Sequence, residues 1–279
     1  MNKNYLILII AIMSLLFSQS EYQILDIPKN SLQVSANNGL YNTSRIFMKP
    51  NYKYEFSIIK YPADIGLYNI QYNNLSFSIL DYGQFNDNLN NSIINTFYSH
   101  ELLLDYFILK EVKNIGIFGL SIGGFYSQIE KYKSYGLCMN FGYKKEFNKL
   151  ITSISIENFG IIFSDYTYYK LRLPLKYRGS FIYNFMNINL GYDLIYSKIN
   201  KDYQHILNIG INLNKNIKLQ FSNSNYNSNM AINSYDYNFL SGLGVGTNIN
   251  LDKINLGCSV LNLGASGLLY SITFKYNSI

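Results

Sequence analysis

Apolar and polar side chains alternate at a period of two residues along most of the chain. Over residues 188–197 the apolar positions are Ile188, Leu190, Tyr192, Leu194 and Tyr196, and most positions between them are small or polar. Successive side chains of a β-strand point to opposite faces, so this pattern predicts a strand with one apolar and one polar face. The same alternation recurs over residues 134–143, 207–214, 217–222, 239–251 and 268–276.

About 14 such segments can be marked along the sequence. A tilted strand needs about 9–11 residues to cross a bilayer, and most of these segments are of that order. The stretch from Phe97 to Lys110 is the most ambiguous. The strands are expected to start near Lys53, Ile65, Leu75, Glu101, Ile115, Ser134, Leu150, Arg178, Ile188, Ile206, Asn216, Asn238, Lys253 and Leu268.

The connections between these segments differ in length. Outer-membrane barrels have short turns at one end and longer loops at the other. Outside the N-terminus, no segment sustains the 3.6-residue period of a helix. Very short turns are expected at Asn73-Asn74, Lys215 and Asp252, and longer polar gaps over Gly83–Ser99, Gly160–Tyr177 and Ser224–Tyr237.

Alternation alone does not show which face meets solvent. The apolar face of a soluble sandwich points to a core, whereas that of a membrane barrel meets lipid. Tyr and Phe gather at segment ends, for example at Tyr135 and Tyr143, as in the aromatic belts at membrane interfaces. The polar faces are rich in Gly, Asn and Ser. These features favour an all-β fold, an antiparallel transmembrane β-barrel of about 14 strands; a secreted sandwich or solenoid is the alternative.

The N-terminus predicts export. A short basic start is followed by an apolar run from Tyr5 to Phe17 and by Ser18-Gln19-Ser20, which is the pattern of a signal peptide cleaved after Ser20. An anchoring helix would need a longer apolar run. We therefore expect a signal peptide over 1–20, an N-terminal segment over 21–52 that can insert into the lumen, and an outer-membrane barrel over 53–279.

Composition narrows the class further. The 279 residues are 48% hydrophobic and 14% charged, with a formal net charge of +6. A disordered chain would be less hydrophobic and more charged, and two cysteines do not make a disulfide scaffold. The positive charges are spread along the sequence, so they do not mark a nucleic-acid surface.

Several short stretches resemble the PorV/PorQ family, a branch of the FadL-like outer-membrane barrels. They occur in the family's order and span nearly the whole mature chain. The departure is Asn37-Asn38-Gly39-Leu40-Tyr41-Asn42, which lacks the family's Gly-rich "NPAG" segment. The stretches are Ile24–Ser31 ("FL.IP.GAR"), Tyr61–Ile65 ("ADI"), Ile156–Gly160 ("NLG"), Leu173–Phe181 ("LP...R.G..Y"), and Gly242–Val245 with Asn262–Gly264 as the closing hairpin.

The resemblance implies a 14-stranded barrel that acts as an adaptor or structural component of a type IX secretion or surface-attachment system. Its partners would be outer-membrane lipid and proteins of that system, bound through extracellular loops. The alternative is FadL-like transport of hydrophobic small molecules, which requires an apolar pocket and a mobile plug. A weaker third hypothesis is a diffusion pore.

The sequence offers no constellation of catalytic residues, so we expect no enzyme, no catalytic residue, no cofactor and no metal. His100 and His205 lack partners at a recognisable spacing, and surface positions are expected for both, with His205 in a turn. Cys138 falls on a polar face and Cys258 on an apolar one, so we expect two free thiols, because a disulfide requires facing Cβ vectors.

Two further features keep two interpretations each. Gly242, Gly244 and Gly246 are expected together on the inward face, where they leave room for bulky neighbours, for the N-terminal segment or for an apolar ligand. The aromatic loop over residues 165–170 is either a membrane-interface loop or a docking surface. The glycines at 116, 119, 123 and 124 lack the context of a phosphate-binding loop.

Overall fold

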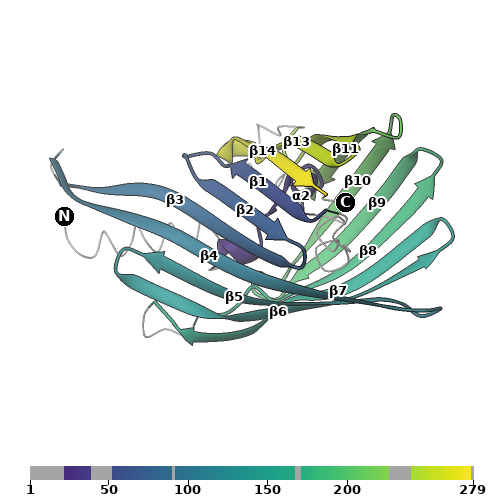
Figure 1. The fold of residues 1–279 in the computed structure, drawn as a ribbon. Coiled ribbons are helices and arrows are strands. Elements are labelled where there is room, and N and C mark those ends of the chain that lie inside the picture. The colour runs from purple at the N-terminus through teal and green to yellow at the C-terminus, as the bar shows by residue number, and fades with distance from the viewer. Residues whose placement is uncertain (1–21, 39–51, 90–91, 167–170, 226–239, 278–279) are drawn as a thin grey trace.

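The computed structural model describes residues 22–38, 52–89, 92–166, 171–225 and 240–277. These residues form fourteen β-strands that close into one antiparallel barrel (Figure 1). The fold class and the strand number expected from the sequence are confirmed. The strands are β1 (Tyr54–Lys60), β2 (Gly66–Tyr72), β3 (Leu75–Leu89), β4 (Ser92–Val112), β5 (Gly116–Ile129), β6 (Tyr132–Phe147), β7 (Leu150–Ser164), β8 (Lys176–Phe185), β9 (Ile188–Ser197), β10 (Asp202–Asn212), β11 (Ile217–Ser224), β12 (Gly244–Leu251), β13 (Ile254–Asn262) and β14 (Leu268–Tyr276).

The first and last strands close the barrel. β1 pairs with β14 along its whole length, from Tyr54 opposite Tyr276 to Lys60 opposite Tyr270. Each other strand pairs with its neighbours in sequence. A closed sheet is one of the few structures that can hydrogen-bond its backbone within a membrane.

The outer face of the barrel is apolar and the inner face is mostly polar. In β14, Tyr270, Ile272 and Phe274 are 52%, 63% and 40% exposed, whereas Ser271 and Thr273 between them are buried. A large apolar face around a polar interior is the arrangement of a membrane barrel. The alternating pattern of the sequence therefore has its apolar side toward lipid.

The two ends of the barrel differ. The connections 73–74, 113–115, 148–149, 186–187, 213–216 and 252–253 lie at the end where β1 begins and β14 finishes. Longer connections, among them 165–175 and 225–243, lie at the opposite end. Because outer-membrane barrels have their short turns in the periplasm, we call these the periplasmic end and the outer end.

The expected loop over Gly83–Ser99 is wrong. β3 runs to Leu89 and β4 begins at Ser92, nine residues before the expected start at Glu101, and the ambiguous stretch Phe97–Lys110 belongs to β4. Past Asp81, β3 pairs only with β4, in a two-stranded ribbon that projects from the outer end (Figure 1). A ribbon outside the membrane has no face to bury, so its sequence lacks the alternation that marks the other strands.

Three further expectations are corrected. His205 lies inside β10 rather than in a turn, because that strand begins at Asp202 and not near Ile206. β12 begins at Gly244, and the expected start at Asn238 lies outside the described residues. Gly242 precedes β12 with a φ of 82°, so it belongs to a turn and not to the inward face of the strand.

The segment over residues 22–38 lies inside the barrel. It contains a 3-10 helix, η1 (Gln23–Leu25), and a single α-helical turn, α2 (Ser31–Ser35). The Asn30 side chain caps α2 by accepting from the Gln33 N–H at 3.0 Å, as N-cap residues do. Within the described residues, neither helix is long and apolar enough to span a membrane. The remaining positions of the expected segment 21–52, apart from Tyr52, and the expected signal peptide 1–20 lie outside the described residues.

Leu207, 61% exposed near the middle of β10, tests the assignment of the outer face to lipid. Leu207→Lys is expected to lower the free energy of unfolding from lipid vesicles by about 2–4 kcal/mol, since a charge would enter the hydrocarbon. Urea titration, followed by the gel mobility of unheated samples, measures this loss. Leu207→Phe is the control and should have little effect; equal losses in both variants would contradict the assignment.

Candidate functional site

The candidate site is the contact between residues 22–38 and the barrel wall. α2 packs against β12 and β13 at glycines that make room for it. A Cβ at Gly246 would stand 2.5 Å from the Ser35 Cβ, and one at Gly244 would stand 2.7 Å from the Ser35 carbonyl oxygen. Of the alternatives for these glycines, room for the N-terminal segment is therefore the one that the structure supports.

Hydrogen bonds attach both ends of α2 to the wall. At its start, the Ser31 N–H donates to Thr273 Oγ1 at 2.8 Å. Beyond its end, Asn37 Nδ2 donates to Ser222 Oγ at 2.8 Å and to the Gly242 carbonyl at 2.6 Å. The inward polar faces of β11 and β14 thus supply the partners that the short helix lacks.

A buried arginine joins the segment to β7, β8 and β9. Arg178 on β8 contacts Glu157 on β7 through two nitrogens, at 2.9 Å and 3.2 Å. Its Nη1 donates to the Asn38 carbonyl at 2.5 Å and lies 3.9 Å from Asp193. Arg178 is 4% exposed, and a buried charge is tolerated only when it is paired and hydrogen-bonded. The Asn38 carbonyl completes that pairing, so the segment contributes to the partners of the arginine.

A second junction lies one residue further along β7. Asn158 has a φ of 61° at a register shift between β6 and β7, and its N–H donates to Asn140 Oδ1 at 2.7 Å. Its Nδ2 donates to Asp26 Oδ1 at 2.9 Å and to the Pro174 carbonyl at 3.2 Å. Lys176 forms an ion pair with Asp26 at 3.1 Å. Asn158 therefore contacts β6 through its backbone N–H, and the internal segment and the loop before β8 through its side chain.

The pairing between β7 and β8 ends at this junction. β7 pairs with β8 only as far as Glu157 opposite Lys176. Its pairing with β6 continues to Ser164. Residues 158–164 of β7 therefore extend toward the outer end past the paired part of β8. Their outward side chains Phe159, Ile161 and Phe163 are more than half exposed, so the unpaired margin faces lipid.

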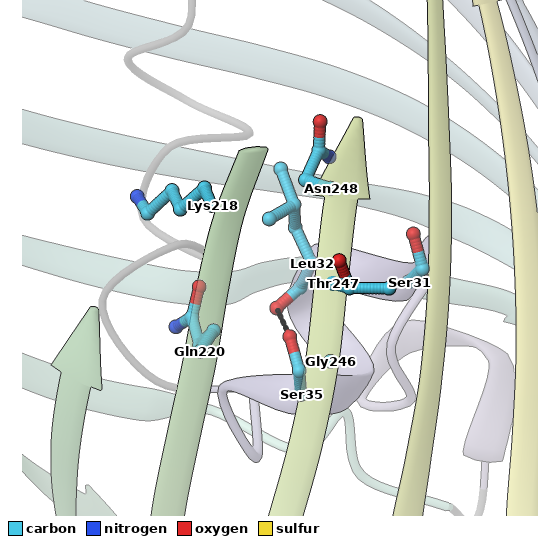
Figure 2. Close-up of a pocket in the computed structure, with 8 residues that line it drawn as sticks. All are labelled: Ser31, Leu32, Ser35, Lys218, Gln220, Gly246, Thr247 and Asn248. Atoms are coloured by element: carbon cyan, nitrogen blue, oxygen red, sulfur yellow. Dashed lines mark hydrogen bonds between the residues drawn. The ribbon is translucent and has the colours of Figure 1, made fainter. Parts of the chain in front are cut away.

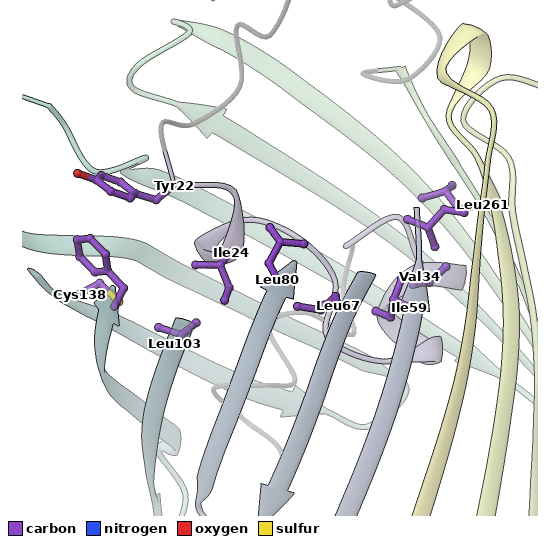
Figure 3. Close-up of a cluster of buried hydrophobic side chains, with 11 residues drawn as sticks. Tyr22, Ile24, Val34, Ile59, Leu67, Leu80, Leu103, Cys138 and Leu261 are labelled. Atoms are coloured by element: carbon purple, nitrogen blue, oxygen red, sulfur yellow. The ribbon is translucent and has the colours of Figure 1, made fainter. Parts of the chain in front are cut away.

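An internal apolar cluster lies between the segment and β1–β6, β13 and β14 (Figure 3). In this cluster, Phe125 and the Tyr22 ring have centroids 4.7 Å apart. Leu171, Leu173 and Tyr166 of the β7–β8 connection pack against it from the outer end. Its members are Tyr22, Ile24, Val34, Ile59, Leu67, Leu80, Leu103, Phe125, Cys138, Leu261 and Leu269.

Polar side chains fix the segment within this cluster. Glu101 accepts the Ile24 N–H at 2.8 Å and the Tyr82 hydroxyl at 2.9 Å. The Tyr22 hydroxyl lies 2.6 Å from Ser134 Oγ. Tyr61, in the β1–β2 connection, packs against the cluster, and burial raises the pKa of its phenol. The phenol of Tyr61 therefore stays protonated at neutral pH.

A small recess lies beside α2, between its exposed side and strands β11 and β12 (Figure 2). Its empty volume is about 180 Å³, including space open to solvent. Ligand pockets for drug-sized molecules are about 300–1,000 Å³, so this recess is too small and too polar for such an apolar ligand. Its lining consists of Ser31, Leu32, Ser35, Lys218, Gln220, Gly246, Thr247 and Asn248.

Of the histidines and cysteines of the sequence, only Cys138 belongs to this site, as a member of the internal apolar cluster. His205 is exposed on β10, where Nδ1 lies 2.7 Å from the Tyr192 hydroxyl, and His100 is partly exposed on β4. Cys138 is buried on the inner face and Cys258 is exposed on the outer face, and the two do not form a disulfide, as expected. In the described part of the chain, no group of three His, Cys, Asp or Glu side chains could hold a metal ion. Of the aromatic loop 165–170, only Asp165 and Tyr166 are described.

Sequence reasoning did not single out Asp26, Asn158 or Arg178 as partners. Three of the stretches that carry the family resemblance nevertheless meet in these junctions: Ile24–Ser31 through Asp26, Ile156–Gly160 through Glu157 and Asn158, and Leu173–Phe181 through Lys176 and Arg178. One feature of the sequence could have indicated these junctions: a charged residue at an inward position of a predicted strand, because such a charge needs a partner within the barrel.

No protein-family model matches the sequence, and no protein of curated function matches it. Solved structures of outer-membrane barrels do resemble the fold. The toluene transporter TbuX of Ralstonia pickettii matches with a TM-score of 0.53 at 7% identity, over 91% of this chain and 99% of that one. A KdgM porin (TM-score 0.33, 12% identity, 81% and 99% coverage) and CdiB from Acinetobacter baumannii (0.40, 9%, 80% and 59%) also match. The likeness to TbuX, together with the closed barrel and its apolar outer face, identifies the protein as a barrel of the bacterial outer membrane.

Gly246→Ala tests the fit of α2 against β12. The added methyl group would overlap Ser35, so we expect a loss of about 1–3 kcal/mol in unfolding free energy. Hydrogen exchange should become faster over residues 31–38. Gly179→Ala is the matched control, because a Cβ there meets nothing within 4 Å. Unchanged exchange in Gly246→Ala would contradict this packing.

Arg178→Met tests the buried ion pair. It leaves Glu157 without its cation, so we expect a loss of about 3–5 kcal/mol in unfolding free energy. Arg178→Met combined with Glu157→Leu should lose less, because no uncompensated charge remains. Urea unfolding of the two variants measures both effects. If the double variant is no more stable than the single one, the pair does not carry the energy assigned to it.

Proposed function

We propose that this barrel passes small hydrophobic molecules across the outer membrane and that residues 22–38 form its internal plug. The observation that carries the proposal is the internal apolar cluster beside the unpaired part of β7. It places an apolar interior next to a lipid-facing margin of the wall. A plugged barrel with a polar lumen alone would need neither feature.

The likeness to TbuX supports the architecture that this function requires. TbuX, a FadL-like transporter of toluene, has the same fold over nearly its entire length. The likeness concerns the fold alone at 7% identity. The assignment of apolar molecules to this chain therefore rests on its own side chains.

The apolar cluster is filled by the plug in this structure. Tyr22 and Ile24 belong to this cluster and are buried. A molecule that enters from the outer end or from the side must displace them. The junctions at Asp26 and Arg178 lie beside the unpaired margin, so a shift of the plug would alter the contacts of Asn158 at the same place.

A second candidate is the adaptor role in a type IX secretion or surface-attachment system. The observation that favours it is the number of buried polar contacts that hold residues 22–38, from Glu101 to Arg178. A fixed plug suits a barrel that binds proteins at its outer end. The two candidates differ in whether the plug has to move.

A disulfide between α2 and β13 distinguishes them. A Cβ at position 257 would lie 3.3 Å from the Ser31 Cβ, close to the 3.5–4.5 Å of disulfides. We expect Ser31→Cys with Gly257→Cys, in a background of Cys138→Ser and Cys258→Ser, to reduce uptake of labelled toluene and oleate to background when oxidised. Reduction should restore uptake. Ser31→Cys alone is the control.

Absence of uptake by the wild-type barrel would reject the transport proposal. Uptake that continues in the oxidised variant would reject movement of the plug. A pull-down from solubilised outer membranes tests the adaptor role separately. In that case secretion or attachment proteins should copurify equally with the oxidised and the reduced variant.

A further inference from the structure

A ring of lysines surrounds the periplasmic end of the barrel. We leave aside Lys218, which lines the recess, and the ion pairs Glu55–Lys275 and Lys144–Glu146. With these set aside, Glu111 and Asp252 are the only acidic residues among the described residues within five positions of the short turns. The periplasmic lysine ring consists of Lys53, Lys110, Lys113, Lys145, Lys149, Lys215 and Lys253.

The outer end is nearly balanced in charge. This charge count again excludes the side chains of the internal ion pairs, including Asp193 beside Arg178. Six basic side chains then stand against four acidic ones, among the residues within five positions of the outer connections whose side chains the structure describes. The positive field of the described residues is therefore concentrated at the periplasmic end. The basic residues are Lys60, Lys131, Lys133, Arg172, Lys198 and Lys201, and the acidic residues are Asp64, Glu130, Asp165 and Asp202.

The lysines of the ring lie at the depth of lipid headgroups. Lys145 Nζ is 5.0 Å from the centroid of the exposed Phe147 ring, and Lys53 Nζ is 5.7 Å from that of Tyr54. Lys110 follows the exposed Tyr106 and Ile108 on the lipid-facing side of β4. Aromatic rings mark the membrane interface, and lysine stems extend along it with the ammonium groups in the headgroup layer.

We propose that the periplasmic lysine ring binds the anionic headgroups of phospholipids in the inner leaflet of the outer membrane. Each lysine near an anionic surface adds to the attraction, so several lysines together give a clear preference for anionic lipid. The ring extends over β1, β4–β7 and β10–β13 rather than forming one patch. A circular distribution at headgroup depth matches the surrounding lipids better than it matches a single acidic protein.

The experiment is a lipid competition on the full barrel, reconstituted in nanodiscs of phosphatidylglycerol and phosphatidylcholine. Native mass spectrometry counts the lipids that remain bound. We expect phosphatidylglycerol to be enriched at about 0.1 M salt and the enrichment to disappear at about 1 M, where the Debye length is about 3 Å.

Two matched variants locate the site. Lys110→Gln, Lys113→Gln, Lys145→Gln and Lys149→Gln together should reduce the enrichment roughly tenfold or more. Lys131→Gln, Lys133→Gln, Lys198→Gln and Lys201→Gln together remove as many lysines from the outer end and should leave it unchanged.

Several outcomes would overturn the proposal. They are a wild-type barrel without preference for phosphatidylglycerol, an enrichment that is insensitive to salt, and an equal loss in both variants. Retention of an acidic periplasmic protein by a barrel without lipid preference would assign the ring to that partner instead. The salt titration of the wild-type barrel decides the question even if a variant fails to fold.

Discussion

Closure of β1 on β14 is the constraint on which the other features depend. Backbone N–H and C=O groups in a bilayer must be paired within the protein, and fourteen strands achieve this only because the last returns to the first. Closure creates an interior, and the alternation of side chains makes that interior polar. Buried polar groups then need partners, and residues 22–38 supply many of them, including the carbonyl that Arg178 contacts.

The plug contacts the wall in two ways, through polar contacts that fix its position and through apolar contacts that a ligand could replace. The polar contacts at Ser31, Asn37 and Asn38 hold the segment in one place. The apolar contacts of Tyr22 and Ile24 fill a space that a small hydrophobic molecule could occupy. Because apolar contacts are non-directional, a ligand can replace them more readily than it can replace the hydrogen bond from Arg178 to the Asn38 carbonyl. We therefore expect movement of the plug to begin at the Tyr22 end and to reach α2 afterwards.

The barrel could be predicted from the sequence because apolar and polar residues alternate along its membrane-spanning strands. Leu207, Ile209 and Ile211 alternate with polar residues, and so do Ile272 and Phe274. The alternation fails where a strand has no membrane face, as in the β3–β4 ribbon, or where polar residues extend a strand, as at His205. The alternation could not predict the internal site. Asp26, Asn158 and Arg178 are far apart in the sequence, and their contacts depend on the register and closure of the whole sheet.

The strands differ greatly in length around the circumference. β4 has 21 residues and β6 has 16, whereas the consecutive strands β11, β12, β13, β14, β1 and β2 have only 7 to 9 each. At about 3.3 Å per residue and a tilt near 45°, eight residues span roughly 20 Å of membrane thickness. A hydrophobic belt shorter than the hydrocarbon core makes the bilayer thin locally or recruits neighbours that shield it. The side of this barrel that runs from β11 through β14 and β1 to β2 therefore imposes a local depression on the membrane, and the side around β4–β7 does not.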